Sequence, residues 1–240
     1  MINGIIDIGN SSVKFGVFEN HQLMKSGKCA FGDWTPIQEL AKAYPDAQWM
    51  MSTVQEAPST SELGIQYQLL DVRERLPVTI AYATPSTLGK DRIAAVCGAW
   101  SLFPGIPCLV IDAGTCITFD FIDAQGVYHG GSISPGLHMR LKAMHQFTGK
   151  LPELSWEEPE GFIGNSTQTS MLQGVKQGLI GEVLHQVELY KKEYSGLKVL
   201  ITGGDAPFFE KNLKIDIFAA PNLVLIGLNT LLLHKQSLDA

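Results

Sequence analysis

The sequence is poor in basic residues and in cysteine, and each shortage argues against a class of protein. Its 240 residues carry 18 Lys+Arg against 24 Asp+Glu, a formal net charge of −6. General nucleic-acid binders usually present a basic face that displaces counterions from phosphates, so we expect no nucleic-acid partner. The four cysteines include no C-x-x-C pair, which disfavours both a disulfide framework and a zinc site. Reduced thiols in the cytoplasm fit this pattern best.

Long apolar runs are also missing. The N-terminal apolar segment breaks at Asp7, which is too early for a signal sequence, and the run Leu223–Leu233 is shorter than the roughly 18 residues of a membrane span. We therefore expect a cytoplasmic protein with no membrane partner. The Walker motif, the protein-kinase loops and the H-E-x-x-H spacing are absent, which disfavours those ATP-using and metal-dependent classes.

What the sequence does contain is a succession of β-branched segments and helical patterns, which predicts an α/β fold. Met171, Val175 and Leu179 belong to an apolar stripe at helical spacing in the longest candidate helix. The predicted strands are Gly4–Ile8, Ser12–Phe18, Ala47–Thr53, Pro77–Tyr82, Cys108–Asp112 and Lys198–Thr202. The predicted helices are Lys90–Phe103, Pro135–Phe147, Gln168–Tyr194 and Asn222–His234.

An internal echo organises the chain. The run Ile5–Ser11 (IIDIGNS) is matched by Val110–Cys116 (VIDAGTC), and in both an apolar strand delivers an Asp, with a Gly two residues later. Each copy predicts a strand, a tight turn and a second strand. Two copies predict a duplicated domain, with residues 1–105 as the first half and 106–240 as the second.

The first copy has the residue types that hold a nucleotide phosphate at a turn. Gly9 lets the backbone approach an anion, and hydroxyl and ammonium donors follow it. Asp7 is a candidate ligand for Mg²⁺ or its water, because a carboxylate beside polyphosphate needs a cation between them. An Asx-capped turn is the alternative for a lone D-x-G motif. The candidate ATP-binding residues here are Asp7, Ile8, Gly9, Asn10, Ser11, Ser12, Val13 and Lys14.

The second copy supplies the other half of a phosphate clamp, with Thr115 as a donor and Asp112 as a cation ligand. Downstream, Gly203 and Gly204 end a strand where a flat base can lie against the backbone, although such a pair is often a plain turn. This arrangement resembles the actin-like ATPase and sugar-kinase superfamily. The resemblance implies two similar ribonuclease H-like domains around an interdomain cleft that binds ATP.

Two further blocks make the resemblance more specific. Residues 84–92 (TPSTLGKDR) end in G-x-D-R, and residues 130–136 (GGSISPG) lead into a helix that is followed by the run 148–152 (TGKLP). Together with the two hairpins and the glycine pair, these blocks are similar to those of the type III pantothenate kinases. The match is weakest over residues 19–76, for which we expect only a scaffold role.

The resemblance implies phosphorylation of pantothenate to 4′-phosphopantothenate, the first step of coenzyme A synthesis. Asp91 would be the general base, because phosphoryl transfer needs little more than positioning and charge neutralisation. Its alternative is a helix cap. Arg92 can pair with the carboxylate of the substrate, and its alternative is a surface salt bridge.

Other site assignments follow from the resemblance alone. Gly89, Lys90, Asp91 and Arg92 would line the pantothenate pocket, with Tyr82 on its wall and Thr167 contributed by the partner of a homodimer. Tyr82 is otherwise a core aromatic residue and Thr167 a helix cap. ATP would bind with Mg²⁺, and Asp112 would bind a monovalent cation, K⁺ or NH₄⁺. Two rival hypotheses remain, a kinase for a sugar or another small alcohol, and a non-catalytic ATP-binding regulator.

Overall fold

The computed structural model describes residues 1–238 and shows two sheets with helices packed on them. The chain packs as two compact units. Unit 1 contains Met1–Cys108, Asp120–Gly130 and the C-terminal segment that starts at Asn222, whereas unit 2 contains Leu109–Phe119 and Gly131–Pro221. The predicted α/β class is confirmed.

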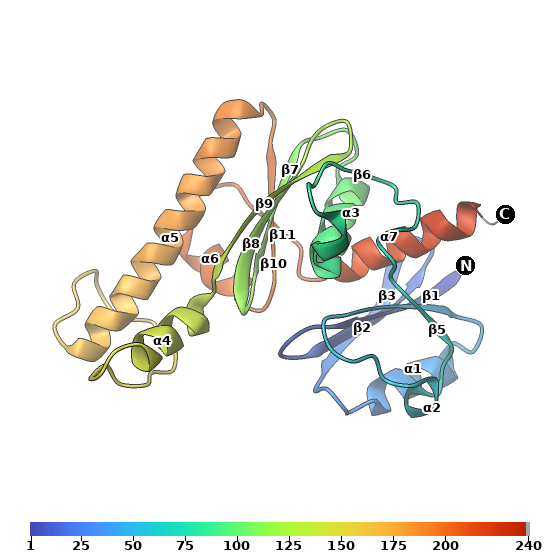
Figure 1. Ribbon diagram of the computed structural model, residues 1–240, viewed down its shortest axis with the longest axis horizontal. Helices are drawn as coiled ribbons and strands as arrows, with labels where there is room; N and C mark the ends of the chain where they lie inside the picture. Colours follow the sequence, from blue (N-terminus) through green and yellow to red (C-terminus); the bar gives the residue numbers. More distant parts are fainter. Residues whose placement is uncertain (239–240) are drawn as a thin grey trace. The chain divides into compact units, whose positions relative to one another are not determined.

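Unit 1 is built on a five-stranded sheet with the order β3-β2-β1-β4-β5 (Figure 1). The strands are β1 (Ile2–Ile8), β2 (Val13–Glu19), β3 (Gln22–Cys29), β4 (Gln48–Thr53) and β5 (Tyr67–Leu69). Helices α1 (Thr35–Ala43) and α2 (Thr60–Leu63) cover one face, where Ile37 and Leu63 join a core with Ile6 and Ile8. Because side chains alternate along a strand, Asn3 points to the opposite face and bonds there to Asn229 of α7 (Leu223–Leu238).

Helix α3 (Lys90–Leu102) packs along α7 at an unusually short distance. A Cβ atom added to Gly227 would lie 1.7 Å from the carbonyl oxygen of Ala94, and one added to Gly98 would lie 2.5 Å from that of Leu223. The two glycines therefore let the helix backbones touch. This contact contributes to the burial of α3, in which every residue from Arg92 to Ala99 is buried.

The second sheet has the order β11-β10-β7-β8-β9-β6. Its strands are β6 (Thr79–Ile80), β7 (Cys108–Ala113), β8 (Cys116–Ile122), β9 (Val127–Pro135), β10 (Lys198–Thr202) and β11 (Phe218–Ala219). Unit 2 carries the helices α4 (Leu137–Gln146), α5 (Thr167–Glu193) and α6 (Ala206–Asn212). A short 3₁₀ turn, Pro85–Thr87, precedes α3 in unit 1.

Most predicted elements are confirmed within a few residues, and the differences have physical causes. The apolar stripe of α5 is buried as predicted, with Met171, Val175 and Leu179 at most 5% exposed. The predicted strand Pro77–Tyr82 is wrong in extent, because only Thr79–Ile80 pairs, at the edge of its sheet. Helix α7 continues past His234 to Leu238. Strand β3 was not predicted because its side chains are mostly exposed and polar.

The compact units and the predicted halves differ in two segments. The first segment of unit 1 ends at Cys108, close to the predicted break at residue 105, but Asp120–Gly130 and α7 pack with unit 1 although both lie in the predicted second half. Grouping by packing does not test a duplication, so the assignment of 1–105 and 106–240 as domains stays a prediction. In the described part of the chain, no helix is both long and apolar enough to cross a membrane.

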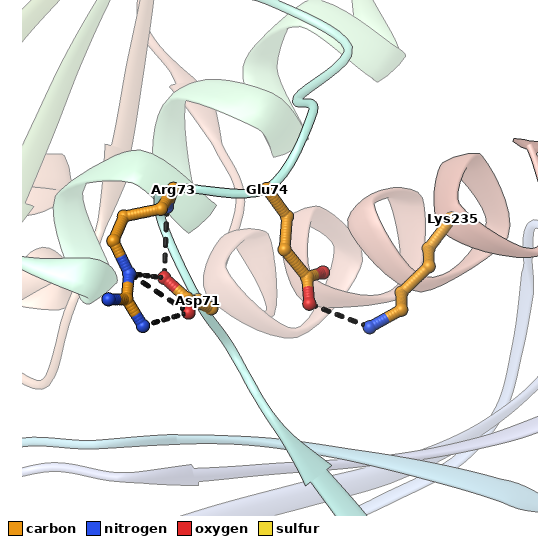
Figure 2. A network of polar contacts seen from close by, with 4 residues as sticks. All are labelled: Asp71, Arg73, Glu74 and Lys235. Carbon is orange, nitrogen blue, oxygen red and sulfur yellow. Dashed lines mark hydrogen bonds and ion pairs between the residues drawn. The ribbon is translucent and has the colours of Figure 1, made fainter.

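The segment between β5 and β6 carries surface ion pairs within unit 1. Figure 2 shows the side chain of Arg73 bonded to that of Asp71, and Glu74 paired with Lys235 of α7. Nη2 of Arg73 lies 2.6 Å from Oδ2 of Asp71, and Nζ of Lys235 lies 2.8 Å from Oε1 of Glu74. Pairs as exposed as these contribute little to the free energy of unfolding. The Asp71–Arg73 pair lies within the segment, whereas the Glu74–Lys235 pair links the segment to α7.

Candidate functional site

The first hairpin, in unit 1, has the predicted form. Asp7 of β1 lies directly opposite Lys14 of β2, and the backbone N–H of Gly9 donates to the carbonyl of Ser12 (3.1 Å) across the turn. Asn10 and Ser11 are exposed at its tip, where hydroxyl and backbone donors can meet an anion. Asp7 is half-buried at the end of the strand.

Ile8 and Val13, both predicted to bind ATP at this hairpin, offer a ligand only their backbone atoms. The side chains of Ile8 and Val13 are fully buried and belong to the core between the sheet and α1. Their backbone atoms form the last pair of the β1–β2 ladder before the turn. The side chain of Gln55 stabilises the turn, because its Nε2 donates a hydrogen bond to the carbonyl oxygen of Gly9 (2.8 Å).

The second hairpin, in unit 2, is enclosed by glycines from two distant segments. A Cβ on Gly136 would lie 2.1 Å from the carbonyl oxygen of Gly114, and a Cβ on Gly203 would lie 2.1 Å from that of Ala113 and 2.6 Å from Oδ1 of Asp112. Gly203 also has φ of +97°, a conformation that favours glycine. The structure thus brings the predicted cation ligand Asp112 and the predicted adenosine residue Gly203 together.

Asp205 also contacts the second hairpin of unit 2. Its backbone N–H donates to the carbonyl of Ala113 (2.9 Å), and its carboxylate lies 4.0 Å from Nε2 of His138. Burial raises the pKa of Asp205, and the charge of His138 opposes that shift only in part. Thr115, the predicted phosphate donor, and Gly204, a predicted adenosine residue, are both exposed.

Asp91 stands in the first turn of α3, in unit 1. Its Oδ1 accepts a hydrogen bond from the backbone N–H of Arg92 (2.9 Å). A Cβ on Gly89 would lie 2.5 Å from the same oxygen, so the absence of a side chain there leaves room for the carboxylate. The cap position of α3 is Gly89 and not Asp91, so the alternative role of Asp91 as the helix cap is wrong. The half-buried carboxylate lies where the helix dipole favours a negative charge.

The side chain of Arg92 is buried, so its alternative role in a surface salt bridge is wrong. Only 7% of it is exposed, and Asp120 of β8, its partner, is fully buried. Nε donates to Oδ1 of Asp120 (2.9 Å), while Nη2 lies 2.6 Å from the same oxygen. The guanidinium carbon lies 5.9 Å from the centre of the Tyr82 ring, within the range of a cation–π contact. Arg92 and Tyr82, both predicted to line the pantothenate pocket, are therefore in contact.

Asp120 and Tyr128 belong to this group, yet the sequence reasoning gave them no role. The Tyr128 hydroxyl donates to Oδ1 of Asp120 (2.5 Å), and its ring stacks on that of Tyr82 with the centroids 6.2 Å apart. The available signal was a carboxylate between Phe119 and Phe121 in an apolar strand, because a buried charge requires a partner. Identifying that partner required the fold, since Arg92 is 28 positions away.

Thr167 belongs to unit 2. It is the first residue of α5 and is exposed. The cap of that helix is Ser166, whose hydroxyl accepts from the backbone N–H of Thr169, so the alternative role of Thr167 as the cap is wrong. Phe162 and Ile163, just upstream, are 75% and 72% exposed.

Carboxylates in the described residues do not gather into a ready-made metal cage. Across residues 1–238, no group of three or more His, Cys, Asp or Glu side chains is arranged to hold a metal ion. Single carboxylates such as Asp7 and Asp112 remain suitable for Mg²⁺ that is shared with phosphate oxygens and water, which is how this ion usually binds beside nucleotides.

Comparison with protein families places this geometry in context. The model of the type III pantothenate kinase family matches residues 5–189. A type III pantothenate kinase of Bacteroides fragilis (strain YCH46) is 41% identical over 240 residues, covering 98% of this chain and 99% of its own. Another, from Cytophaga hutchinsonii, is 40% identical over 233 residues, covering 96% and 98%.

Solved structures agree at the level of the fold. A conserved protein assigned to the Baf family of transcriptional activators, from Campylobacter jejuni, superposes with a TM-score of 0.63 at 21% identity, over 98% of this chain and 99% of that one. The activator of the 2-hydroxyisocaproyl-CoA dehydratase from Clostridium difficile, with bound ADPNP, gives 0.56 at 12% identity, over 100% and 97%. These structures share the fold of this chain over nearly its whole length.

Proposed function

Because the chain belongs to the type III pantothenate kinase family, we propose that it transfers the γ-phosphoryl group of ATP to the primary hydroxyl of pantothenate. The product is 4′-phosphopantothenate, and the reaction is the first step of coenzyme A synthesis. The observation that carries this proposal is the family match over residues 5–189, which includes both hairpins and the G-x-D-R block.

Asp91 is the proposed general base. It accepts the proton of the attacking hydroxyl while the hydroxyl oxygen forms a bond to the γ-phosphorus and the bond to the β-phosphate oxygen breaks, so that ADP leaves. Two features support this role, the bond from the N–H of Arg92, which fixes the carboxylate, and the position in the first turn of α3, where the helix dipole favours a negative charge.

The other residues of the G-x-D-R block bind the acceptor in this proposal. Arg92 receives the carboxylate of pantothenate, Tyr82 forms a wall of the pocket, and the backbone of Gly89 and Lys90 lines it. The contact of Arg92 with the Tyr82 ring supports a shared pocket within unit 1.

Each hairpin contributes donors to the phosphates of ATP. Backbone N–H groups at Asn10 to Ser12, the ammonium of Lys14 and the hydroxyl of Thr115 suit the triphosphate, and the backbone at Gly203 and Gly204 suits the adenosine. Bound Mg²⁺ would neutralise phosphate charge, with Asp7 as its candidate ligand. Asp112 is the candidate ligand for K⁺ or NH₄⁺, and its half-buried carboxylate beside Gly203 supports that assignment.

The proposed quaternary state is a cytoplasmic homodimer in which Thr167 of one copy contacts the pantothenate of the other. The exposed Phe162 and Ile163 beside Thr167 support an interface at the start of α5, and the four free cysteines support a reducing compartment. Light scattering on the purified protein measures the oligomeric state, and a monomer at micromolar concentration would contradict the dimer.

The acceptor is tested with a panel of alcohols. Purified protein with ATP and Mg²⁺ is given pantothenate, glucose, N-acetylmannosamine or glycerol, and ADP release is followed in K⁺, NH₄⁺ or Na⁺ buffer. We expect turnover with pantothenate alone, and a faster rate in K⁺ or NH₄⁺ than in Na⁺. A preference for a sugar would support the rival kinase hypothesis, and ATP binding without turnover of any acceptor would support a non-catalytic regulator.

A further inference from the structure

Three side chains in unit 1 surround the guanidinium of Arg92. Oδ1 of Asp120 accepts from Nε of Arg92 at 2.9 Å and from the Tyr128 hydroxyl at 2.5 Å, and Tyr128 stacks on Tyr82, whose ring faces Arg92. Asp120, Tyr128 and the arginine side chain are 0%, 0% and 7% exposed. We call Asp120, Tyr128 and Tyr82 the arginine clamp.

A glycine in β9 leaves room for the Tyr82 ring of the arginine clamp. Gly130 of β9 has φ of +97°, and a Cβ there would lie 2.9 Å from the Tyr82 ring. A side chain at position 130 would therefore push Tyr82 away from Tyr128. The glycine lets the two rings stack and keeps Tyr82 against Arg92.

The electrostatics of the clamp keep its charge states fixed. Burial lowers the pKa of Arg92, but the bond and charge of Asp120 outweigh burial and raise it. Burial raises the pKa of Tyr128, and the charge of Asp120 raises it further, so its hydroxyl stays protonated and donates. Arg92 is thus a permanent cation, and the hydrogen bond from its Nε to Asp120 holds the guanidinium in one orientation.

Resting on the function proposed above, we propose that Asp120 and Tyr128 are positioning residues that select an acceptor bearing a carboxylate, by holding the guanidinium of Arg92 in one orientation. A guanidinium is planar and rigid, so bonding its Nε edge to Asp120 fixes the direction of its remaining N–H donors. A fork that is already oriented loses less freedom when it binds a carboxylate. An arginine side chain free to change rotamer would bind the carboxylate with lower affinity and would discriminate less between acceptors with and without a carboxylate.

The alternative is that the buried pair only stabilises unit 1. A buried ion pair can be retained without contributing to function, and removal of one partner destabilises a protein whatever its role. The two possibilities differ in a kinetic property. Positioning predicts a change in the KM for an acceptor with a carboxylate, whereas a structural role predicts equal changes for every acceptor and for ATP.

The test measures kcat and KM for pantothenate and for its analogue with the carboxylate reduced to an alcohol. Tyr128→Phe keeps the ring and its stacking and removes only the hydroxyl bonded to Asp120. We expect it to raise the KM for pantothenate about three- to tenfold, the loss of one hydrogen bond, with the KM for ATP and the kinetics of the alcohol analogue unchanged. Asp120→Asn should show the same pattern with a larger change.

Two further variants keep the test decisive if Asp120→Asn fails to fold. In an Arg92→Met background, Tyr128→Phe should have no additional effect on the pantothenate KM, because the arginine through which it acts is gone. The matched control is Asp123→Asn, a carboxylate at the end of the same β8–β9 hairpin that bonds to His129 and not to Arg92. It should leave both acceptors unaffected.

The outcomes separate this inference from the proposed function. No turnover of pantothenate by the wild-type protein would remove the proposed function. Turnover by the wild type, with equal changes for both acceptors in Tyr128→Phe, or with an additional effect of Tyr128→Phe in the Arg92→Met background, would overturn the positioning role alone.

Discussion

Replacing Gly203 by alanine should be among the most damaging small substitutions in unit 2. The new Cβ would lie 2.1 Å from the carbonyl oxygen of Ala113, where real Cβ contacts are not closer than 3.0 Å, and the neighbour is backbone that cannot rotate away. β10 and β7 must then separate by roughly 1 Å, an overpacking that costs about 1–3 kcal/mol. The φ of +97° adds about 1–2 kcal/mol for a residue with a side chain.

The neighbouring glycine provides the matched control. A Cβ on Gly204 meets no atom within 4 Å, so Gly204→Ala should change the free energy of unfolding by no more than about 0.5 kcal/mol. Gly203→Ala should lower it by about 2–5 kcal/mol, the sum of the two costs above. Urea unfolding followed by circular dichroism measures both. Equal midpoints for the two variants would refute the reasoning that backbone contact at Gly203 fixes the second hairpin.

Other predictions concern polar groups elsewhere in the chain. Asn229→Ala should destabilise the protein by about 1–3 kcal/mol without changing the KM for ATP, because Asn3 loses its buried acceptor at 2.9 Å; an unchanged urea midpoint would contradict this. Lys235→Ala should change stability by less than about 0.5 kcal/mol, because its partner Glu74 is half-exposed; a larger loss in the same assay would show that the surface pair matters. Burial raises the pKa of Asp205, so its contribution is complete below the unfolded pKa near 4 and is lost as pH rises through the higher folded value. Asp205→Asn should therefore be more stable than wild type at pH 7 and match it near pH 3; a gain that persists at pH 3 would exclude the carboxylate as its source.

The sequence predicted the parts of this fold that depend on local patterns. The two hairpins follow from an Asp and a Gly at fixed spacing after an apolar strand, and α5 follows from buried residues at helical intervals. Strand β3 escaped prediction because its side chains are mostly exposed, so its existence depends on backbone pairing with β2. The length of β6 was overestimated, because the length of an edge strand is limited by its pairing with the neighbouring strand and not by its own residues.

In the candidate site, too, local motifs could be predicted from the sequence and long-range contacts could not. Asp91 and Arg92 were identified from a motif, but the burial of Arg92 and its pairing with Asp120 depend on contacts between α3 and β8 that no local pattern encodes. The closeness of Gly203 to Asp112 likewise arises from two strands that are neighbours in the sheet, although the two residues are 91 positions apart in the chain. Long-range pairing of this kind is decided by the packing of the whole chain.

The measurement that tests the central claim most directly is pantothenate-dependent ADP release by Asp91→Asn. The substitution keeps the size of the side chain and its place in the first turn of α3, while removing the group that accepts the proton. We expect ATP binding, measured by calorimetry, and the urea midpoint to stay near those of the wild type, and the rate to fall by about 10²- to 10⁴-fold. A rate within a few-fold of the wild type would contradict the assignment of Asp91 as the base.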